Sequence, residues 1–391
     1  MNTNYKKVLL GDVVKINSSS YSTKDNLQYV NYLDTGNITD NVIDEIQRID
    51  LSIDRLPSRA KRKVKYNSII YSTVRPNQRH FGIIKEQPEN FLVSTGFAVI
   101  DVIEELADAD FIYYWLTQNK VVDLLHAIAE QSVSAYPSIK PSNIETLEIL
   151  LPELHEQKRI ASMLNVLSKK IVINNSINSN LEKQLSLIYH NYFDNETRYV
   201  ELGTVVETTS GGTPSRKNTA YYSDANICWV KSKELLGSYI IDTEEHINDL
   251  AINKSSAKLL PAHSVLIAMY GATVGAYGVT SKTMACNQAI CALLENEKYP
   301  YTYLYQLAKE SQQVLMNMAV GSAQQNVSQI LIKQLHIHSN IVKVQSFHNF
   351  ALPIHQKIES IQFENKALEN LRNCLLPKLM SGELDVSDIN N

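Results

Sequence analysis

Residues 160–192 read IASMLNVLSKKIVINNSINSNLEKQLSLIYHNY, and this stretch decides the fold. Its apolar and amide residues recur with an unbroken 4-3 spacing, at positions 160, 164, 167, 171, 174, 178, 181, 185, 188 and 192. Such a spacing places one stripe along an α-helix and makes the helix supercoil with a partner. The sequence therefore predicts a long helix that pairs with another. An ordinary amphipathic helix lying on its own domain is the alternative.

The same spacing occurs again 187 positions later, so that residue 160 corresponds to residue 347 and residue 192 to residue 379. Both copies place an asparagine in the stripe, at Asn178 and Asn365. Polar residues at such core positions fix register and orientation in coiled coils, at some cost in stability. The second copy therefore predicts the partner helix. The stripe residues that we expect to pair the helices are Leu164, Leu167, Ile171, Leu181, Ile354, Ile358, Ile361 and Leu368.

Two prolines and a glycine bear on the limits of the second helix. Pro353 is expected in its first turn, where the missing N–H costs nothing. Pro377 and Gly382 are expected to kink or end the helix near Leu379, because proline cannot continue a helix and glycine favours its C-terminal cap.

Shorter repeats outside the helices indicate that the chain contains two copies of one framework. Residues 10–14 (LGDVV) recur as 202–206 (LGTVV), and residues 68–71 (SIIY) match 264–267 (SVLI). Each framework combines β-branched or aromatic runs with a later helical stretch, which favours an α+β fold. We predict two globular domains separated by two long antiparallel coiled-coil helices, with an internal pseudo-twofold repeat. The predicted boundaries are 1–150, 151–199, 200–341 and 342–391.

The composition indicates a folded protein with more than one core. The chain has 391 residues, a net charge of −4 and 20% charged side chains, which argues against disorder and against a histone-like nucleic-acid binder. Residues 259–281 carry no charge, but a proline and three glycines predict strand, turn and strand instead of a membrane span. The four cysteines lack paired CxxC spacing, and no secretory signal is evident. We therefore expect reduced thiols and a cytoplasmic location, without membrane association.

Catalytic motifs are missing from the sequence. It contains no P-loop, no GxGxxG after a strand, no HExxH and no GxSxG. The histidines at 336, 338, 348 and 355 have no acidic or cysteine partner at the spacing of a metal site. We predict no catalytic residue, no metal site and no cofactor in this chain. An enzyme of unrecognised type, such as a nuclease, is an alternative.

A basic stretch favours nucleic-acid binding. Residues 55–85 hold nine basic side chains and no acidic one, and such groups neutralise phosphates while arginine and glutamine can also read base edges. In the second domain, basic residues flank 210–215 (SGGTPS), whose glycines permit close backbone approach. A solvated basic surface is the alternative. The expected DNA-binding residues are Arg59, Lys61, Arg62, Lys63, Lys65, Arg75, Gln78 and Arg79, with Arg216, Lys217, Lys231, Lys233 and Tyr270 in the second domain.

The chain resembles the specificity subunit of type I restriction–modification systems, and the resemblance covers essentially the whole length of the chain. The most specific matches are residues 151–160 (LPELHEQKRI), entering the first long helix, and 375–384 (LLPKLMSGEL), closing the second. Shorter matches to the framework of a family target-recognition domain lie at 210–215, 229–230, 271–275 and 321–326.

The resemblance implies a non-catalytic DNA-recognition subunit. Each domain would bind one half of a split double-stranded DNA target, and the helices would set the spacer. Two methyltransferase subunits would supply S-adenosylmethionine and the pocket for a flipped adenine. Restriction subunits, if present, would add cleavage that needs ATP and Mg²⁺. A coiled-coil scaffold for other proteins, without DNA specificity, is the alternative.

Overall fold

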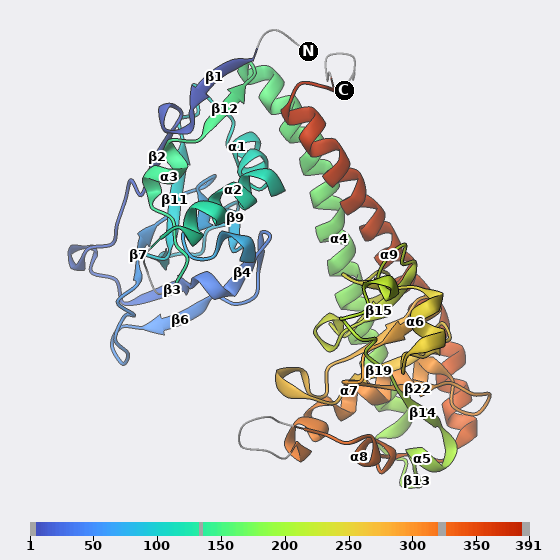
Figure 1. Ribbon diagram of the computed structural model, residues 1–391. Helices are drawn as coiled ribbons and strands as arrows, with labels where there is room; N and C mark the ends of the chain where they lie inside the picture. Colours follow the sequence, from blue (N-terminus) through green and yellow to red (C-terminus); the bar gives the residue numbers. More distant parts are fainter. Residues whose placement is uncertain (1–4, 133–135, 320–325, 385–391) are drawn as a thin grey trace. The chain divides into compact units, whose positions relative to one another are not determined.

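The computed structural model describes residues 5–132, 136–319 and 326–384 (Figure 1). The chain divides into two compact units, and each long helix contributes to both. The N-terminal unit comprises residues 1–170 and 369–391, and the C-terminal unit comprises residues 171–368. The long helices are α4 (Leu154–Phe193) and α9 (Ile341–Met380).

The N-terminal unit contains two four-stranded sheets and two two-stranded ones. The first sheet has the order β2 (Val14–Ile16), β11 (Phe97–Val102), β8 (Ile69–Ser72), β9 (Phe81–Ile83). The second has the order β6 (Gln47–Asp50), β3 (Tyr29–Leu33), β10 (Phe91–Ser94), β7 (Ala60–Lys63). The short pairs are β1 (Lys6–Leu9) with β12 (Glu148–Leu151) and β4 (Ile38–Thr39) with β5 (Val42–Ile43). The helices are α1 (Ala109–Leu116), α2 (Asn119–Glu130) and α3 (Pro141–Glu145).

The C-terminal unit repeats the two larger sheets and one short pair, with one additional edge strand in its first sheet. Its first sheet has the order β14 (Glu207–Ser210), β22 (Ile290–Leu294), β19 (Val265–Ala268), β20 (Tyr277–Thr280), β16 (Tyr239–Ile240). The second has the order β17 (His246–Ile247), β15 (Ile227–Val230), β21 (Met284–Cys286), β18 (Leu259–Leu260). The short pair is β13 (Tyr199–Glu201) with β23 (His336–His338). The helices are α5 (Leu202–Val205), α6 (Asp249–Lys254), α7 (Tyr301–Met318) and α8 (Gln329–Lys333).

The duplication predicted from the sequence is present in strand order and in strand direction. β3 and β10 run parallel, as do β15 and β21. Their outer neighbours run antiparallel in both units. The matching residues 68–71 and 264–267 begin one residue before β8 and β19 and continue into them, and these strands occupy the same place in the two first sheets. The α+β fold class and the internal repeat are therefore confirmed.

The repeated LG motif has a packing reason. A Cβ atom on Gly11 would lie 3.1 Å from the Cβ of Glu145 on α3, and one on Gly203 would lie 2.7 Å from the Cβ of Lys333 on α8. Distances this short leave little space for a side chain. Glycine at both positions lets the turn that follows the first strand of each domain pack closely against a short helix. This helix is α3 in the N-terminal domain and α8 in the C-terminal domain.

The two long helices pack against each other in antiparallel orientation, as predicted. In the C-terminal unit, Asn174 on α4 contacts Asn365 on α9, and the ring of Tyr192 lies 6.1 Å from that of Phe347. Residue numbers thus rise along one helix as they fall along the other. Of the eight expected pairing residues, Leu164, Ile358 and Ile361 are buried, while Leu167, Ile171, Leu181, Ile354 and Leu368 are half-buried.

Three expectations about helices and apolar segments can be compared with the structure. The predicted place of Pro353 is wrong: α9 begins at Ile341, where the carbonyl of Asn340 accepts the N–H of Val344, so Pro353 lies in the helix interior. The helix does end near Gly382, whose φ is +72°. The uncharged stretch 259–281 forms β18, β19 and β20. None of the helices in the described part of the chain combines the length and apolar character needed to cross a membrane.

Candidate nucleic-acid interface

The loop between β8 and β9 presents polar side chains to solvent. Pro76–Gln78 form a single 3-10 turn, and the residues on either side, Arg75 and Arg79, have φ angles of +46° and +58°. Left-handed backbone at non-glycine residues is costly and is often found at functional sites. The side chains of Arg75 and Gln78 are exposed, and the Arg75 guanidinium lies 5.5 Å from the ring centre of Tyr136. This loop can therefore offer Arg75 and Gln78 to a ligand.

Arg79 anchors the same loop to the rest of the domain. Its Nε donates to both carboxylate oxygens of Asp40, at 2.7 and 3.0 Å. Its Nη1 donates to Oδ1 of Asn119 at 3.1 Å, and its Nη2 approaches the carbonyl of Thr117 at 3.4 Å. Because these donors are engaged within the domain, the structure assigns Arg79 a supporting place, whereas the sequence grouped it with the base-reading candidates.

The consecutive cations of β7 differ in their surroundings. Val93 pairs with Arg62 and Ser94 with Ala60, so Lys61 lies at a β-bulge, a feature that redirects a side chain. Lys61 is exposed and forms no ion pair with the described residues. Of its neighbours, Lys63 pairs with Asp25 at 2.9 Å and Arg62 lies 3.5 Å from the hydroxyl of Ser20.

The exposed cations Arg59 and Lys65 lie beside this strand in the sequence, just before and just after β7. Figure 1 shows the sheet that holds β7 at the side of its domain away from β1 and β12. Lys85, at the end of the basic stretch, is instead paired with Asp110 at 2.9 Å. Four basic residues of the stretch that form no ion pair with the described residues, Arg59, Lys61, Arg62 and Lys65, thus lie on β7 or beside it in the sequence.

The C-terminal unit has a loop at the equivalent position, but its side chains are uncharged. This loop joins β19 to β20, and Gly271 and Gly275 in it have φ angles of +71° and +79°, as expected of turn glycines. Half-buried Tyr270 forms an isolated bridge with Asn326, as Val74 does with Ser138 in the N-terminal unit. Of the family-like segment 321–326, only residue 326 is among the described residues.

Two of the predicted cations of the C-terminal unit, Arg216 and Lys231, lie beside aromatic rings. The Arg216 guanidinium lies 4.7 Å from the ring centre of Tyr222 and 5.3 Å from that of Trp229. The indole N–H of Trp229 donates to the carbonyl of Gly212 at 3.0 Å, and a Cβ on Gly212 would overlap the carbonyl of Ser256. Gly212 therefore lets its segment pack closely against Ser256 within the domain.

Two glutamates lie among these cations. Glu245 forms ion pairs with both Arg216 and Lys231, and Glu244 lies 2.6 Å from Lys233. Hydrogen bonds from Arg216 lower the pKa of Glu245 to about 2, which keeps the carboxylate charged near neutral pH. Arg216, Lys231 and Lys233 are thus compensated in the free protein. Lys217 is exposed.

This compensation was hard to predict from the sequence. Glu244 and Glu245 lie between β16 and β17, and only the pairing of β15 with β17 brings their segment beside Lys231. The one available signal was the adjacent pair of acidic residues itself, which is common in surface loops.

A comparison with known proteins identifies the class to which this fold belongs. The sequence model of one protein family, described as the type I restriction modification DNA specificity domain, matches residues 2–183 and 195–345. The chain therefore belongs to this family. At the level that the family defines, it is a specificity subunit of a type I restriction–modification system, and its function is recognition of a DNA target.

Individual relatives agree with this assignment. The chain is similar to the type I restriction enzyme HindI specificity subunit of Haemophilus influenzae, with 22% identity over 466 residues, 98% of this chain and 100% of that one. It is 26% identical to the MjaIX specificity subunit of Methanocaldococcus jannaschii over 72% of this chain and 70% of that one.

A solved structure agrees in fold. The crystal structure of a type I restriction-modification system S subunit from M. genitalium matches with a TM-score of 0.57 and 15% identity, over 97% of this chain and 96% of that one. At this level of identity, the likeness supports the fold.

Proposed function

We propose that the chain recognises a two-part sequence in double-stranded DNA, one part with each globular domain. The domains are residues 1–150 and 200–341, and the helical segments 151–199 and 342–391 set the spacer. The observation that carries this proposal is a shared framework with different loops: β8–β9 carries Arg75 and Gln78, whereas the equivalent β19–β20 loop is uncharged. Two copies of one scaffold with different side chains are suited to reading two different sequences.

In the N-terminal domain, phosphate contacts and base contacts come from different elements. Arg59, Lys61 and Lys65 bind phosphates, because they are exposed cations beside one strand. Arg75 and Gln78 read base edges, because guanidinium and amide groups can form paired hydrogen bonds in the major groove. Arg79 supports them by holding the loop to Asp40.

In the C-terminal domain, recognition requires exchange of ion pairs. Arg216, Lys231 and Lys233 are held by glutamates in the free protein, so each must leave a carboxylate to bind a phosphate. Glu244 or Glu245 can instead accept a hydrogen bond from the amino group of cytosine. This domain is therefore expected to contribute fewer phosphate contacts than the N-terminal one.

The chain recruits the catalytic subunits through its helices. In the C-terminal unit, α4 exposes 62% of Val172, 56% of Ile173 and 38% of Ile177, and grouped exposed apolar side chains favour a protein interface. The partners are two methyltransferase subunits, which bring S-adenosylmethionine. Restriction subunits, if present, bring ATP and Mg²⁺. The chain itself takes no part in the chemistry.

Reciprocal domain exchange tests the proposal. Residues 1–150 in one variant, and residues 200–341 in another, are replaced by the corresponding domain of a second specificity subunit, and methylated motifs are mapped by long-read sequencing. Each exchange is expected to change one half of the motif, and the two exchanges are expected to change different halves. A control reinserts the native domain through the same junctions. If either exchange changed both halves, or if neither changed the motif, the proposal would be wrong.

A further inference from the structure

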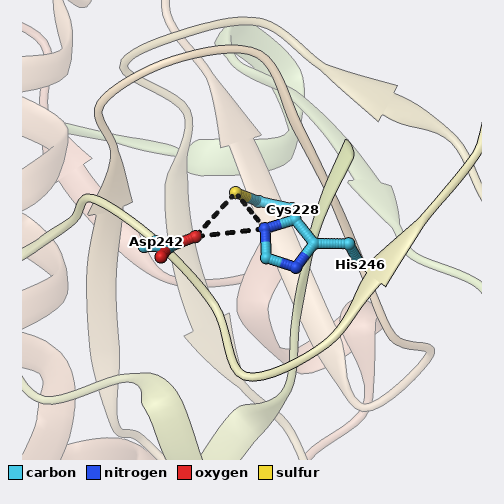
Figure 2. A group of neighbouring side chains, drawn as sticks. All are labelled: Cys228, Asp242 and His246. Carbon is cyan, nitrogen blue, oxygen red and sulfur yellow. Dashed lines mark hydrogen bonds and ion pairs between the residues drawn. The ribbon is translucent and has the colours of Figure 1, made fainter. Parts of the chain in front are cut away.

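Three side chains of different chemical types converge in the C-terminal unit (Figure 2). Cys228 lies on β15, His246 begins β17, and Asp242 lies shortly after β16. The Cys228 Sγ is 3.5 Å from Nε2 of His246 and 3.6 Å from Oδ1 of Asp242, and Nε2 is 3.1 Å from Oδ1. The three atoms therefore form a nearly equilateral triangle.

The dimensions of this triangle match three corners of a tetrahedral metal site. Zinc binds sulfur at about 2.3 Å, and nitrogen and oxygen at about 2.0–2.2 Å. At tetrahedral angles, these bond lengths separate neighbouring ligand atoms by roughly 3.3–3.7 Å. One ion could therefore contact all three atoms with shifts of a few tenths of an ångström.

The arrangement does not suit a catalytic triad. In a triad, the nucleophile and the carboxylate contact opposite nitrogens of the imidazole. Here, Cys228 and Asp242 both face Nε2 of His246, and a single N–H can be directed at only one of them. A cation at the centre would satisfy all three groups together.

The backbone holds the ligands in place. Cys228 and His246 are direct register partners across the antiparallel pair β15–β17. Asp242 is oriented by Lys366, whose Nζ lies 3.4 Å from Oδ2 and leaves Oδ1 directed at the other ligands. Contacts of this kind, outside the ligand set, strengthen metal sites. Cys228 is buried, while Asp242 and His246 are partly exposed, so an ion could enter from solvent.

We propose that Cys228, Asp242 and His246 bind a zinc ion through Sγ, Oδ1 and Nε2, with water as the fourth ligand. A thiolate and an imidazole together favour zinc over magnesium or calcium, and binding releases the thiol proton to solvent. The sequence predicted no metal site, because the ligands come from three elements and match no common spacing.

Zinc at this site would tie down the segment from Asp242 to His246. That segment contains Glu244 and Glu245, which pair with the candidate DNA-binding cations Arg216, Lys231 and Lys233. The ion would thus stabilise a surface beside the proposed DNA interface. Metal binding itself does not depend on the proposed function, so the two can fail separately.

Cobalt titration of the full chain, in the absence of DNA, tests the site. The protein is stripped with a chelator and titrated with Co²⁺, which gives a near-ultraviolet thiolate band and intense visible bands in tetrahedral sites. The expected result is saturation near one equivalent and displacement by Zn²⁺. Cys228→Ala should lose the thiolate band, and Cys291→Ala, a change at another buried cysteine of the same unit, should keep it. No saturable thiolate band, or a band that persists in Cys228→Ala, would overturn the proposal.

A second variant guards against misfolding of Cys228→Ala. His246→Gln retains the thiol and is expected to bind Zn²⁺ at least about tenfold more weakly, because one ligand is lost. Zinc should raise the thermal unfolding temperature of the wild-type chain by more than that of His246→Gln. An equal rise in both proteins would show that zinc binds elsewhere, and the proposal would be rejected. The hydrogen-bonded cluster without metal would then be the correct description.

Discussion

The side-chain amide of Asn174 on α4 donates a hydrogen bond of 2.8 Å to the amide oxygen of Asn365 on α9, inside the seam of the long helices. Asn365 in turn donates to Oδ1 of Asn175 at 2.8 Å. Asn178, one turn further along α4, is also buried, but neither of its amide atoms has a hydrogen-bond partner among the described residues. Asn174 therefore fixes the register of the two helices through its hydrogen bond to Asn365. Asn178 instead costs stability, because its buried amide forms no compensating hydrogen bond with the described residues.

We predict opposite effects from replacing these two asparagines. Asn174→Leu should lower the free energy of unfolding by about 1–3 kcal/mol, because it leaves the Asn365 amide oxygen unpaired. Asn178→Leu should raise it, since it replaces an unpaired buried amide with an apolar side chain of similar size. Denaturant midpoints of the full chain, measured side by side, test both. Equal destabilisation by the two changes would contradict this account of the seam.

A second prediction separates two basic residues of the N-terminal domain. Lys61→Ala should weaken DNA binding and reduce the slope of log K against log[salt] by about 0.9, the effect of one lost phosphate contact. Its stability should change little, because Lys61 is exposed at a bulge. Arg79→Ala should instead destabilise the domain, because it removes the bonds to Asp40, Asn119 and Thr117. Salt titration of binding and thermal unfolding of both variants distinguish the two roles.

A third prediction concerns the carboxylate that neutralises the C-terminal cations. Glu245→Gln removes a negative charge and weakens the hold on Arg216 and Lys231. Non-specific DNA affinity should therefore rise, and its salt dependence should become steeper. Glu207→Gln, at an exposed carboxylate on β14, is the matched control for net charge. If both variants gained affinity equally, bulk charge and not the local cluster would be responsible.

A fourth prediction concerns pH. Burial, with smaller contributions from His348, His263 and Lys309, lowers the pKa of His355 to about 3 from the ordinary 6.5. Above pH 6.5, this histidine is neutral in both the folded and the unfolded chain. Below it, the unfolded chain takes up a proton that the folded chain does not, so stability falls by about 1.4 kcal/mol per pH unit until the folded pKa is reached.

The comparison of two variants isolates this effect from that of other histidines. His355→Gln should flatten the loss of stability between pH 6.5 and the lowest pH at which the chain folds. His336→Gln, at an exposed residue of β23, should retain the wild-type dependence. Unfolding midpoints at several pH values measure both. A His355→Gln curve parallel to that of the wild-type chain would rule out the assigned cause.

The helices and the repeat were predictable because their signals are local and recur in the same order. A 3.5-residue spacing is visible within one segment, and LGDVV and LGTVV can be aligned by inspection. The partners of the asparagines were not predictable in this way. The repeat aligns Asn178 with Asn365, but Asn365 contacts Asn174, because residues equivalent by duplication need not meet across an antiparallel pair.

The different roles of the basic residues at the candidate interface also depend on contacts with residues that are distant in the sequence. The sequence groups Lys61 with Lys63, but the bulge against β10 and the carboxylate of Asp25 separate their roles. Arg79 lies in the basic stretch, but its partner Asp40 comes from a hairpin much earlier in the chain. Contacts formed only on folding decide which cations remain available to DNA.

A fifth prediction concerns the glycine that supports the aromatic scaffold of the C-terminal domain. Gly212→Ala should lower stability by at least about 1–3 kcal/mol, because its methyl group would overlap the carbonyl of Ser256. The shift would also disturb the hydrogen bond from Trp229 to the Gly212 carbonyl, and with it the ring over which Arg216 lies. Gly36→Ala is the matched control, since a Cβ there has no neighbour within 4 Å. Thermal unfolding and DNA binding of both variants test this prediction. If the Gly212→Ala chain were as stable as the Gly36→Ala chain and bound DNA equally well, the close approach of Gly212 to Ser256 would not be required.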